Sequence, residues 1–577
     1  ALLPSPSFPM LPLPLSPSSL LLLLLLLTLA STALAKVQGE PTDSSRTRSL
    51  QWAVAAASTA LLAQRLLGPS ADEEEEEAQK AAQRDTTGKE RAEDVLVWRE
   101  DDGDSKFVPM YPGKLGKAAN GTSNIKLFRM GDVAKHNTRD DLWIIVDGLV
   151  YDVTRYVDRH PGGWLPLVNM AGKDCTDVFA NYHGAKVYRT LLPAFLVGKV
   201  TDLTVPEHVK DFRAVRQELL RRGLFKTDMR YYAKMGTWYF ALFTSALYLS
   251  LACASPAAHM LGATVMGIFW QQLAGLGHDL GHSGVSHMFY TDMCVGSTIG
   301  NALMGISTGW WKRSHNTHHV VCNSVENDPD IQHLPVFAVA AKIFDHPYLS
   351  SYHNKVFNFG AVERFLVAHQ HLLFYPVMMF ARFNLYVQSW TLLLSSSGRE
   401  VHYRRIEAAA LVVYATWVAA VALSMPTWAE TVGWILISHA VTALLHVQIT
   451  VSHWAMETYH GHGYNDETDE WYITQLKTTM NVATPECLDW LHIGLQFQIE
   501  HHLYPRLPRH NLRKARELVR AVCAKHGIPY HEPGFFEANA LTISALRDAA
   551  LEARKAKRDP GHGFYTSALW EAMNAIG

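Results

Sequence analysis

Three clusters of histidine in the second half of the chain have spacings that bring imidazoles together. In chain order the clusters are His278 and His282, then His315, His318 and His319, then Gln498, His501 and His502. Spacings of three and four residues place side chains on one face of a helix, so each cluster can direct two or three ligand atoms to one point. Because histidine is the commonest metal ligand, the pattern predicts a metal site, with His453 as the best additional ligand.

A separate pair of histidines lies earlier in the chain. His160 begins the sequence His-Pro-Gly-Gly, and His183 follows 23 residues later. Two neutral imidazoles can clamp a haem iron from both faces, and such six-coordinate iron only transfers electrons because it has no position for oxygen. The glycine pair lets the chain turn sharply after His160. The segments WIIVDGLVYDVTRYVDRHPGG and AGKDCTDVFANYH resemble cytochrome b5, and this resemblance implies haem b bound by His160 and His183.

The identity of the metal in the three clusters does not follow from residue type, since imidazole binds iron, copper and zinc. The haem domain favours a redox metal, because zinc has no use for electrons. We therefore expect two non-haem irons. Their predicted ligands are His278, His282, His315, His318, His319, His453, Gln498, His501 and His502. The nearby polar residues Asp279, Asn323, Asp328 and Asp330 either orient the imidazoles or serve as helix caps and turn formers.

Four apolar stretches predict a membrane-embedded domain. They cover about residues 232–254, 257–277, 408–425 and 431–451, each close to the ~20 residues that cross a bilayer core. Short breaks at Ser255-Pro256 and around Pro426 predict two helical hairpins, whose outer ends share one side of the membrane. Basic residues near those ends place that side in the cytosol. The weaker stretch 365–394 is interrupted by polar residues, which favours an interfacial segment.

The first 120 residues differ in composition from the rest of the chain. A run of leucine from Leu20 to Leu27 precedes Ala33-Leu34-Ala35, which indicates either a signal or targeting peptide or a low-complexity leader over residues 1–36. Residues 69–120 include the acidic run Glu73 to Glu77 and cannot bury a core, so we expect a disordered linker over residues 37–122.

Charge and cysteine content exclude other classes of protein. The formal net charge is −2, which argues against a nucleic-acid binder that works by bulk charge. The six cysteines form no CxxC pair, which argues against a disulfide framework or a thiolate zinc site. The functional side of the protein is therefore expected to face a reducing compartment.

The residues around the histidine clusters resemble one family over roughly residues 125–530. HDLGH, HNTHHVVCNSVENDPDIQHLP and GLQFQIEHHLYPRLPRHNL are similar to the front-end desaturases fused to cytochrome b5. Gln498 stands where other membrane desaturases carry histidine, which is the mark of that group. Within the group, WWKRSHNTHH, DPDIQHLP, ARFNLYVQSW and KTTMNV look most like the delta-8 sphingolipid desaturases.

The resemblance implies a multi-domain fold class. A small α+β cytochrome b5-like haem domain (123–203) would precede an all-α integral membrane desaturase domain (228–535) with four transmembrane helices and a cytosolic di-iron cap. Residues 536–577 would form a C-terminal tail.

The resemblance also implies a reaction. An NADH-cytochrome b5 reductase would reduce the haem, and O2 would be the co-substrate. The lipid substrate would be a sphingoid long-chain base within ceramide, in the endoplasmic reticulum. Delta-6 and delta-5 acyl desaturases share much of the pattern, so an acyl lipid is the alternative substrate. A fused membrane hydroxylase and a pure electron carrier are two further alternatives, and the leader leaves a plastid location open. Gln498 and the two hairpins favour desaturation.

Overall fold

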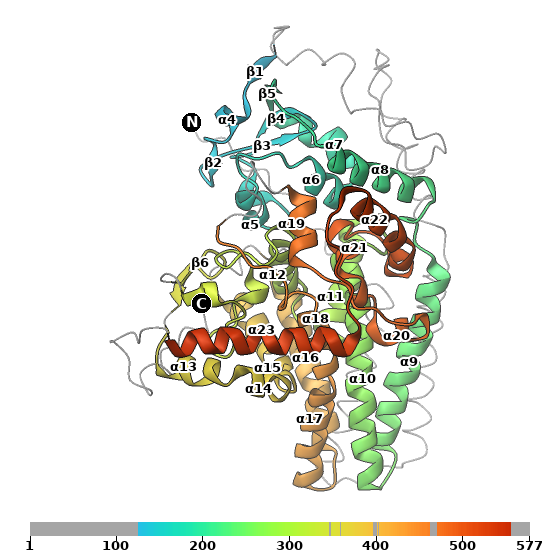
Figure 1. The fold of residues 1–577 in the computed structure, drawn as a ribbon. Helices are drawn as coiled ribbons and strands as arrows, with labels where there is room; N and C mark the ends of the chain where they lie inside the picture. The colour runs from blue at the N-terminus through green and yellow to red at the C-terminus, as the bar shows by residue number, and fades with distance from the viewer. Residues whose placement is uncertain are drawn as a thin grey trace, which may run out of the picture. The chain divides into compact units, whose positions relative to one another are not determined.

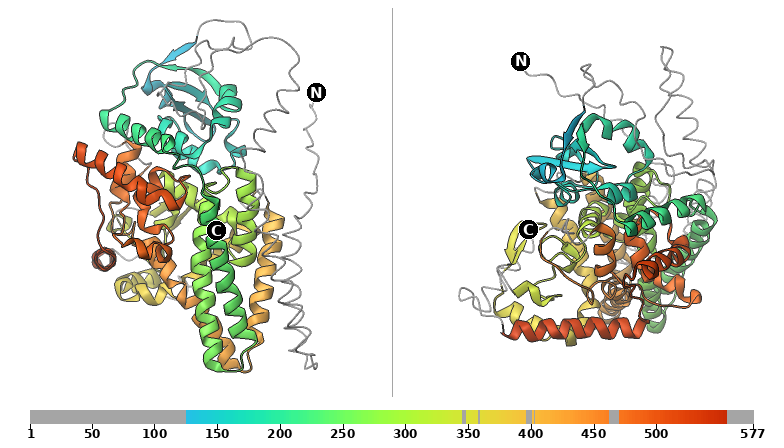
Figure 2. Two further views of the ribbon diagram at one scale, coloured as in Figure 1. Left: turned by 90° about the vertical axis from the view of Figure 1, so that its right-hand side faces the viewer. Right: turned by 45° about the horizontal axis from the view of Figure 1, so that its top comes forward.

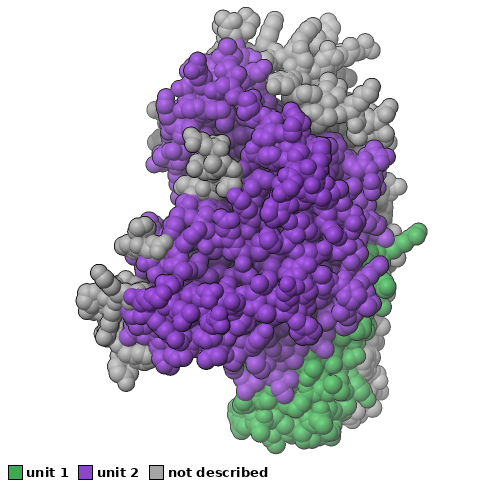
Figure 3. Space-filling model, viewed as in Figure 1, with its two compact units in different colours: residues 1–83, 229–266, 412–435 green, residues 84–228, 267–411, 436–577 purple. Residues whose placement is uncertain are grey.

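The computed structural model describes residues 125–344, 348–357, 359–395, 401, 403–461 and 470–555, which Figure 1 draws in colour. The predicted leader (1–36) and linker (37–122) lie outside the described residues. The chain divides into two compact units, coloured separately in Figure 3. The described part of the first unit is residues 229–266 and 412–435, and the second unit holds the other described residues.

The segment that resembles cytochrome b5 folds as a small α+β domain. Its five strands have the order β1-β5-β4-β3-β2 in one sheet. They are β1 (Lys126–Phe128), β2 (Asn137–Thr138), β3 (Asp141–Val146), β4 (Leu149–Asp152) and β5 (Leu196–Val200). The turn between β3 and β4 has positive φ at both Asp147 (52°) and Gly148 (75°). A two-residue hairpin turn of type I′ requires this backbone, and β3 and β4 pair antiparallel on either side of it.

Short helices accompany this sheet and carry the first pair of histidines. They are α4 (Met130–Val133), η1 (Val157–Arg159), α5 (Trp164–Asn169), α6 (Thr176–Tyr182), α7 (Ala185–Thr190) and η2 (Leu192–Phe195). His160 directly follows η1, and His183 ends α6. The two histidines are thus held at the ends of separate helical segments.

A longer helix, α8 (Glu207–Arg221), follows the small domain. Its buried residues Val209, Phe212, Val215 and Leu219 recur at helical spacing and form one apolar face. These side chains belong to the same buried core as Tyr472, Tyr504 and residues of the small domain. Within the second unit, α8 therefore joins the sheet-containing domain to the histidine-bearing helices.

The four stretches predicted to cross a membrane are helical. They form α9 (Met229–Leu251), α10 (Pro256–Gly281), α16 (Arg404–Leu423), α17 (Trp428–Val441) and α18 (Ala443–Thr450). Among the described helices, Arg404–Leu423 and Trp428–Thr450 have both the length and the apolar composition to cross a bilayer. Crossing by α9 and α10, which are 23 and 26 residues long, stays a prediction.

Polar contacts join α9, α10 and α17 within the first unit. Trp434 Nε1 donates to Ser250 Oγ at 2.9 Å, and the ring of His259 hydrogen-bonds to Glu430. A Cβ at Gly262 would lie 2.5 Å from Ser250 Oγ, so the glycine permits α9 and α10 to run side by side (Figures 1 and 2). These contacts pair polar side chains, which would be energetically unfavourable to bury without a partner in an apolar region.

The weaker apolar stretch forms three short helices, α13 (Ala361–Ala368), α14 (Gln370–Met378) and α15 (Ala381–Leu394). Each is shorter than the ~20 residues of a bilayer crossing, and the interfacial position of this segment stays a prediction. Helix α23 (Phe535–Lys555) lies beside α13 and α14 (Figure 1). Gln370 Nε2 donates to the carbonyl of Leu546 at 2.6 Å. Much of the segment predicted as a C-terminal tail is therefore packed helix, and residues 556–577 lie outside the described residues.

A buried carboxylate caps the helix that carries the second histidine cluster, α12 (Thr308–Val320). Glu407 accepts hydrogen bonds from Ser307 Oγ at 2.6 Å, from Asn301 Nδ2 at 3.0 Å and from the backbone N–H of Gly309 at 3.1 Å. A negative charge at a helix N-terminus also interacts favourably with the helix dipole. Glu407 therefore fixes the start of α12.

Replacing Glu407 with alanine is expected to destabilise the protein by about 3 kcal/mol, because buried donors lose their acceptor. The thermal unfolding midpoint of the purified protein measures this change. Glu407→Gln keeps one acceptor oxygen and should lose less, and Glu552→Ala, at an exposed residue, is the control. An alanine variant that melts with the wild type would contradict the capping role.

Candidate metal centre

Four segments of the second unit bring the predicted histidine ligands together. His278 and His282 lie at the end of α10, and His453 follows α18. Helix α12 carries the second cluster, and α21 (Gln498–Leu503) carries the third. Two groups of side chains could each hold a metal ion, with ligand atoms all within 4.8 Å of one another. The first group is His278, His282, His315 and His501, and the second is His318, Cys322, His453 and His502.

His319 lies between these two groups. Its ring centre is 4.6 Å from that of His282 and 4.1 Å from that of His502. Its Nε2 atom is 3.0 Å from His315 Nε2 and 3.1 Å from His501 Nε2. Two nitrogens bound at right angles to one metal, at about 2.1 Å each, lie about 3 Å apart. The convergence of Nε2 atoms therefore has the dimensions of a metal site.

Several ring nitrogens in the centre are buried without a hydrogen-bond partner in the described part of the chain. They are both nitrogens of His282, Nδ1 of His319 and Nε2 of His502. An unsatisfied buried polar atom costs about 1–3 kcal/mol. Metal coordination would satisfy inward-facing nitrogens of this kind, so these residues fit a metal-binding role.

Burial also keeps these imidazoles in the form that binds metals. Desolvation, reinforced by the neighbouring histidines, lowers the pKa of His282, His319, His501 and His502 well below the usual value. The side chains are therefore neutral at pH 7, and a histidine must be neutral to coordinate a metal.

Outer contacts orient several of the rings by holding Nδ1 and leaving Nε2 free to face the centre. The Nδ1–oxygen contacts are His318 to Asp328 at 2.8 Å, His502 to Gln475 Oε1 at 2.8 Å and His453 to the Thr478 carbonyl at 3.3 Å. At His318, burial lowers the pKa, but Asp328 and Asp330 outweigh that effect and raise it to about 9. Metal binding at His318 would therefore displace a proton from its ring.

The four predicted orienting residues differ in what they contact. Asp328 contacts His318, and Asp330 lies 3.5 Å from His315 Nδ1. Asn323 donates from Nδ2 to the backbone carbonyl of His453 at 3.0 Å, and its own N–H donates to Asp328. Asp279 lies 3.9 Å from His278 Nδ1, whereas its distance to the Arg509 guanidinium is 3.1 Å. Asp279 is therefore better placed to pair with Arg509 than to orient His278.

Two residues of the centre, Cys322 and Gln475, are not among the ligands predicted from the sequence. Cys322 follows His318 by four residues, so helical spacing could have indicated it, and its Sγ lies 3.5 Å from His453 Nδ1. Burial raises the pKa of its thiol well above the usual value. Gln475, on α19 (Trp471–Thr478), carries no motif signal. Gln498 is buried on the same short helix as His501, and its role as a ligand stays a prediction.

Gln475 joins two parts of the centre, since its Oε1 contacts His502 and its Nε2 donates to the His319 carbonyl at 3.1 Å. Gln475→Leu is expected to weaken metal affinity about 10- to 100-fold, the usual cost of losing an outer partner. Iron retained per chain after competition with a chelator measures the change. Gln475→Glu keeps the acceptor oxygen and should retain more iron. Equal retention by wild type and the leucine variant would contradict the orienting role.

The pair His160 and His183 has the geometry of a single-metal clamp. Their ring centres are 6.0 Å apart, close enough for both rings to bind one metal through bonds of about 2.1 Å. Nδ1 of His160 contacts the Gly163 carbonyl at 2.7 Å, and Nδ1 of His183 contacts the Phe179 carbonyl at 3.1 Å, so both Nε2 atoms are left for iron. A Cβ at Gly162 would lie 2.9 Å from His160 Cε1, so glycine is needed there. These residues fit haem ligation.

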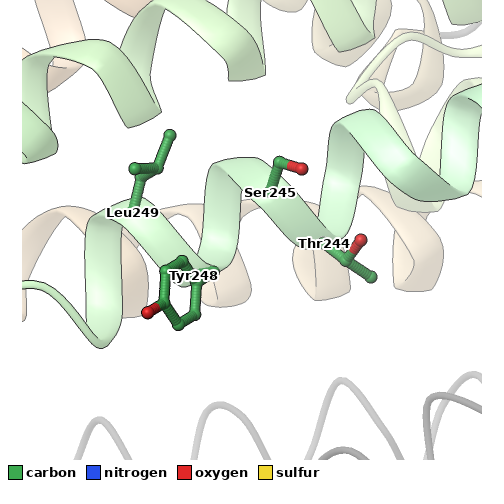
Figure 4. A pocket seen from close by; sticks show the side chains of 4 residues that line it. All are labelled: Thr244, Ser245, Tyr248 and Leu249. Carbon is green, nitrogen blue, oxygen red and sulfur yellow. The ribbon is translucent and has the colours of Figure 1, made fainter.

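A surface pocket of about 300 Å³ lies elsewhere, along α9 (Figure 4). Thr244, Ser245, Tyr248 and Leu249 line it, all from one helix. None of the histidines described above is among these lining residues.

Comparison with known proteins agrees with both halves of this description. Residues 254–534 match the family Fatty acid desaturase, and residues 129–201 match the Cytochrome b5-like Heme/Steroid binding domain. The chain is 39% identical to Delta(8)-fatty-acid desaturase 1 of Arabidopsis thaliana, covering 77% of this chain and 97% of that protein. The chain belongs to the family of fatty acid desaturases fused to cytochrome b5, and is an oxidoreductase with histidine-box metal sites.

Other relatives differ in their named substrates. Acyl-lipid (9-3)-desaturase of Borago officinalis is 36% identical over 79% of this chain and 100% of its own length. Delta 8-(E)-sphingolipid desaturase of Kluyveromyces lactis is 38% identical over 65% of each chain. Sequence identity to these relatives therefore establishes the family but does not distinguish a sphingolipid substrate from an acyl substrate.

Proposed function

We propose that this protein introduces a double bond at the delta-8 position of a sphingoid long-chain base. The main observation behind this proposal is that two groups of potential metal ligands converge in a chain that also has a cytochrome b5-like domain. The resemblance of WWKRSHNTHH and DPDIQHLP to delta-8 sphingolipid desaturases supports the substrate class, as does the named activity of the Kluyveromyces relative.

The histidine groups would hold two irons, and haem b would be held by His160 and His183. Paired iron supplies oxygen activation and hydrogen removal from an unactivated C–H bond, chemistry that side chains lack. The chain's own residues would position these ligands: Asp328 and Gln475 hold imidazoles at Nδ1, and Glu407 fixes the start of α12. The proposed ninth ligand is Gln498.

The cellular setting belongs to the same proposal. Helices α9 and α10 complete four crossings, which leaves the metal centre and the haem domain on the cytosolic side of the endoplasmic reticulum. The basic residues near the outer helix ends support this orientation. An NADH-cytochrome b5 reductase supplies electrons there, and the membrane supplies the lipid.

An acyl-lipid substrate is the second candidate, favoured by the Borago relative that this chain matches over its full length. Desaturation of a fatty acyl chain would use the same metal groups. The two candidates differ only in which lipid chain is held in register with the metals.

Lipid analysis of yeast expressing the full chain tests the proposal. Sphingoid bases and fatty acids are examined together by mass spectrometry with double bonds located, with and without added polyunsaturated precursors. A new double bond in the long-chain base is the expected result. New unsaturation only in fatty acids would replace the sphingolipid proposal with the acyl one, and new hydroxyl groups would indicate a hydroxylase.

A further inference from the structure

The segments that carry His160 and His183 in the small domain lie against α12, the helix that carries the second histidine cluster. The ring centre of Tyr182 lies 6.2 Å from that of His319, in an edge-to-face arrangement with an angle of 82°. Tyr182 is covalently followed by His183. On the other haem-ligand loop, a Cβ at Gly162 would lie 3.6 Å from Asn316 Nδ2 on α12. Both segments thus approach α12 beside its histidines.

Tyr182 makes this contact with its aromatic ring and not with its hydroxyl group. Its hydroxyl oxygen is buried, and no hydrogen-bond partner for it exists among the residues that the structure describes. Burying a hydroxyl without a partner is unfavourable. The contact of Tyr182 with His319 therefore depends on its aromatic ring.

Helix α8 holds α6, the helix that ends at Tyr182, in a defined position. Arg213 makes a two-pronged contact with Asp177, with both nitrogen–oxygen distances 2.8 Å. Arg216 donates to the Ala180 carbonyl at 2.8 Å. The paired geometry of an arginine–carboxylate contact adds directional control to attraction. The two arginines of α8 therefore hold α6 in position by hydrogen bonds.

The histidine-bearing region holds the same helices from its own side. Tyr472 Oη donates to Asp177 at 3.2 Å, and Tyr504 Oη donates to the Phe212 carbonyl at 3.1 Å. The rings of Phe212 and Tyr472 stack at 4.7 Å. Contacts from both sides therefore fix α6 against the centre.

We propose that Tyr182 is the side chain through which electrons pass from the haem domain to the metal groups, and that Arg213 is a positioning residue for this contact. The inference rests on the proposed cofactor assignments. Each transfer oxidises one ferrous haem to ferric and reduces one ferric ion of the metal groups to ferrous. No bond forms or breaks at Tyr182. Two such transfers supply the two electrons that one desaturation requires in addition to those from the lipid.

Reoxidation of the haem in the purified, cofactor-loaded full chain tests this proposal. The haem is reduced, mixed with oxygen and lipid substrate, and followed by its absorption. Tyr182→Leu is expected to slow reoxidation about tenfold or more, with unchanged haem content, iron content and haem midpoint potential. Tyr182→Phe retains the ring and should stay near the wild-type rate. Arg213→Gln, which leaves the ring intact, should also slow reoxidation.

Matched variants separate this inference from the proposed function. Tyr156 has a ring centre 6.2 Å from that of the other haem histidine, His160, and packs on Phe195. Tyr156→Leu should therefore keep the wild-type reoxidation rate. The proposal would be overturned if Tyr156→Leu slowed reoxidation as much as Tyr182→Leu does. It would also be overturned if neither Tyr182→Leu nor Arg213→Gln slowed reoxidation. A wild type that makes no new double bond would instead overturn the proposed function.

Discussion

Replacing His315 with alanine is expected to abolish desaturation while the haem spectrum persists. His315 belongs to the first ligand group, and its Nε2 lies 3.0 Å from His319 Nε2. Losing an outer partner of a metal ligand already costs about 10- to 100-fold in affinity or activity, so losing a ligand should cost more. Lipid product per chain in yeast measures the effect, together with the haem absorption of the purified variant.

A control distinguishes this loss from unfolding. His369 is a half-buried histidine between α13 and α14, outside both ligand groups. His369→Ala should retain activity, haem and iron. An active His315→Ala enzyme would contradict the assignment of this histidine to the metal centre. Loss of haem together with activity would indicate a general structural defect.

The complementary result is expected from His183→Ala. This change removes one side of the pair whose ring centres are 6.0 Å apart, so the variant should lose the haem spectrum and all desaturation driven by NADH. Its non-haem iron should remain, because the ligand groups lie on other elements. Haem absorption and iron content of the purified variant measure the two sites separately.

The outcome that would contradict this prediction is also specific. A His183→Ala chain that keeps a normal six-coordinate haem spectrum would remove His183 from the haem site. Tyr188 offers a nearby control, since it packs on Phe179 rather than facing His160. Tyr188→Phe keeps that ring contact and should retain haem and activity.

Local spacing made most of the centre predictable from the sequence. Helical separations of three and four residues put His315, His318 and His319 on α12, and the structure confirms that helix. The turn at Asp147-Gly148 was equally local, because positive φ at both positions suits these residue types. Signals of this kind depend on neighbours in the chain, which a sequence displays directly.

Residues that act across the fold left no such signal. Gln475 meets His502 from another helix, and Glu407 caps α12 from about 100 residues away in the chain. Asp279 adjoins His278 in sequence, yet Arg509 lies closer to its carboxylate. Such contacts follow from tertiary packing, which spacing and composition do not encode. The helix α23 was missed for a related reason, since its packing partners lie on α13 and α14.

The metal content of the purified full chain tests directly whether two non-haem irons accompany the haem. Total iron by elemental analysis and haem by absorption are measured on the same sample, with zinc and copper as internal comparisons. We expect one haem and two further irons per chain, and loss of the two further irons in His315→Ala without loss of haem. A wild type with zinc in place of the further iron, or with haem as its only iron, would contradict it.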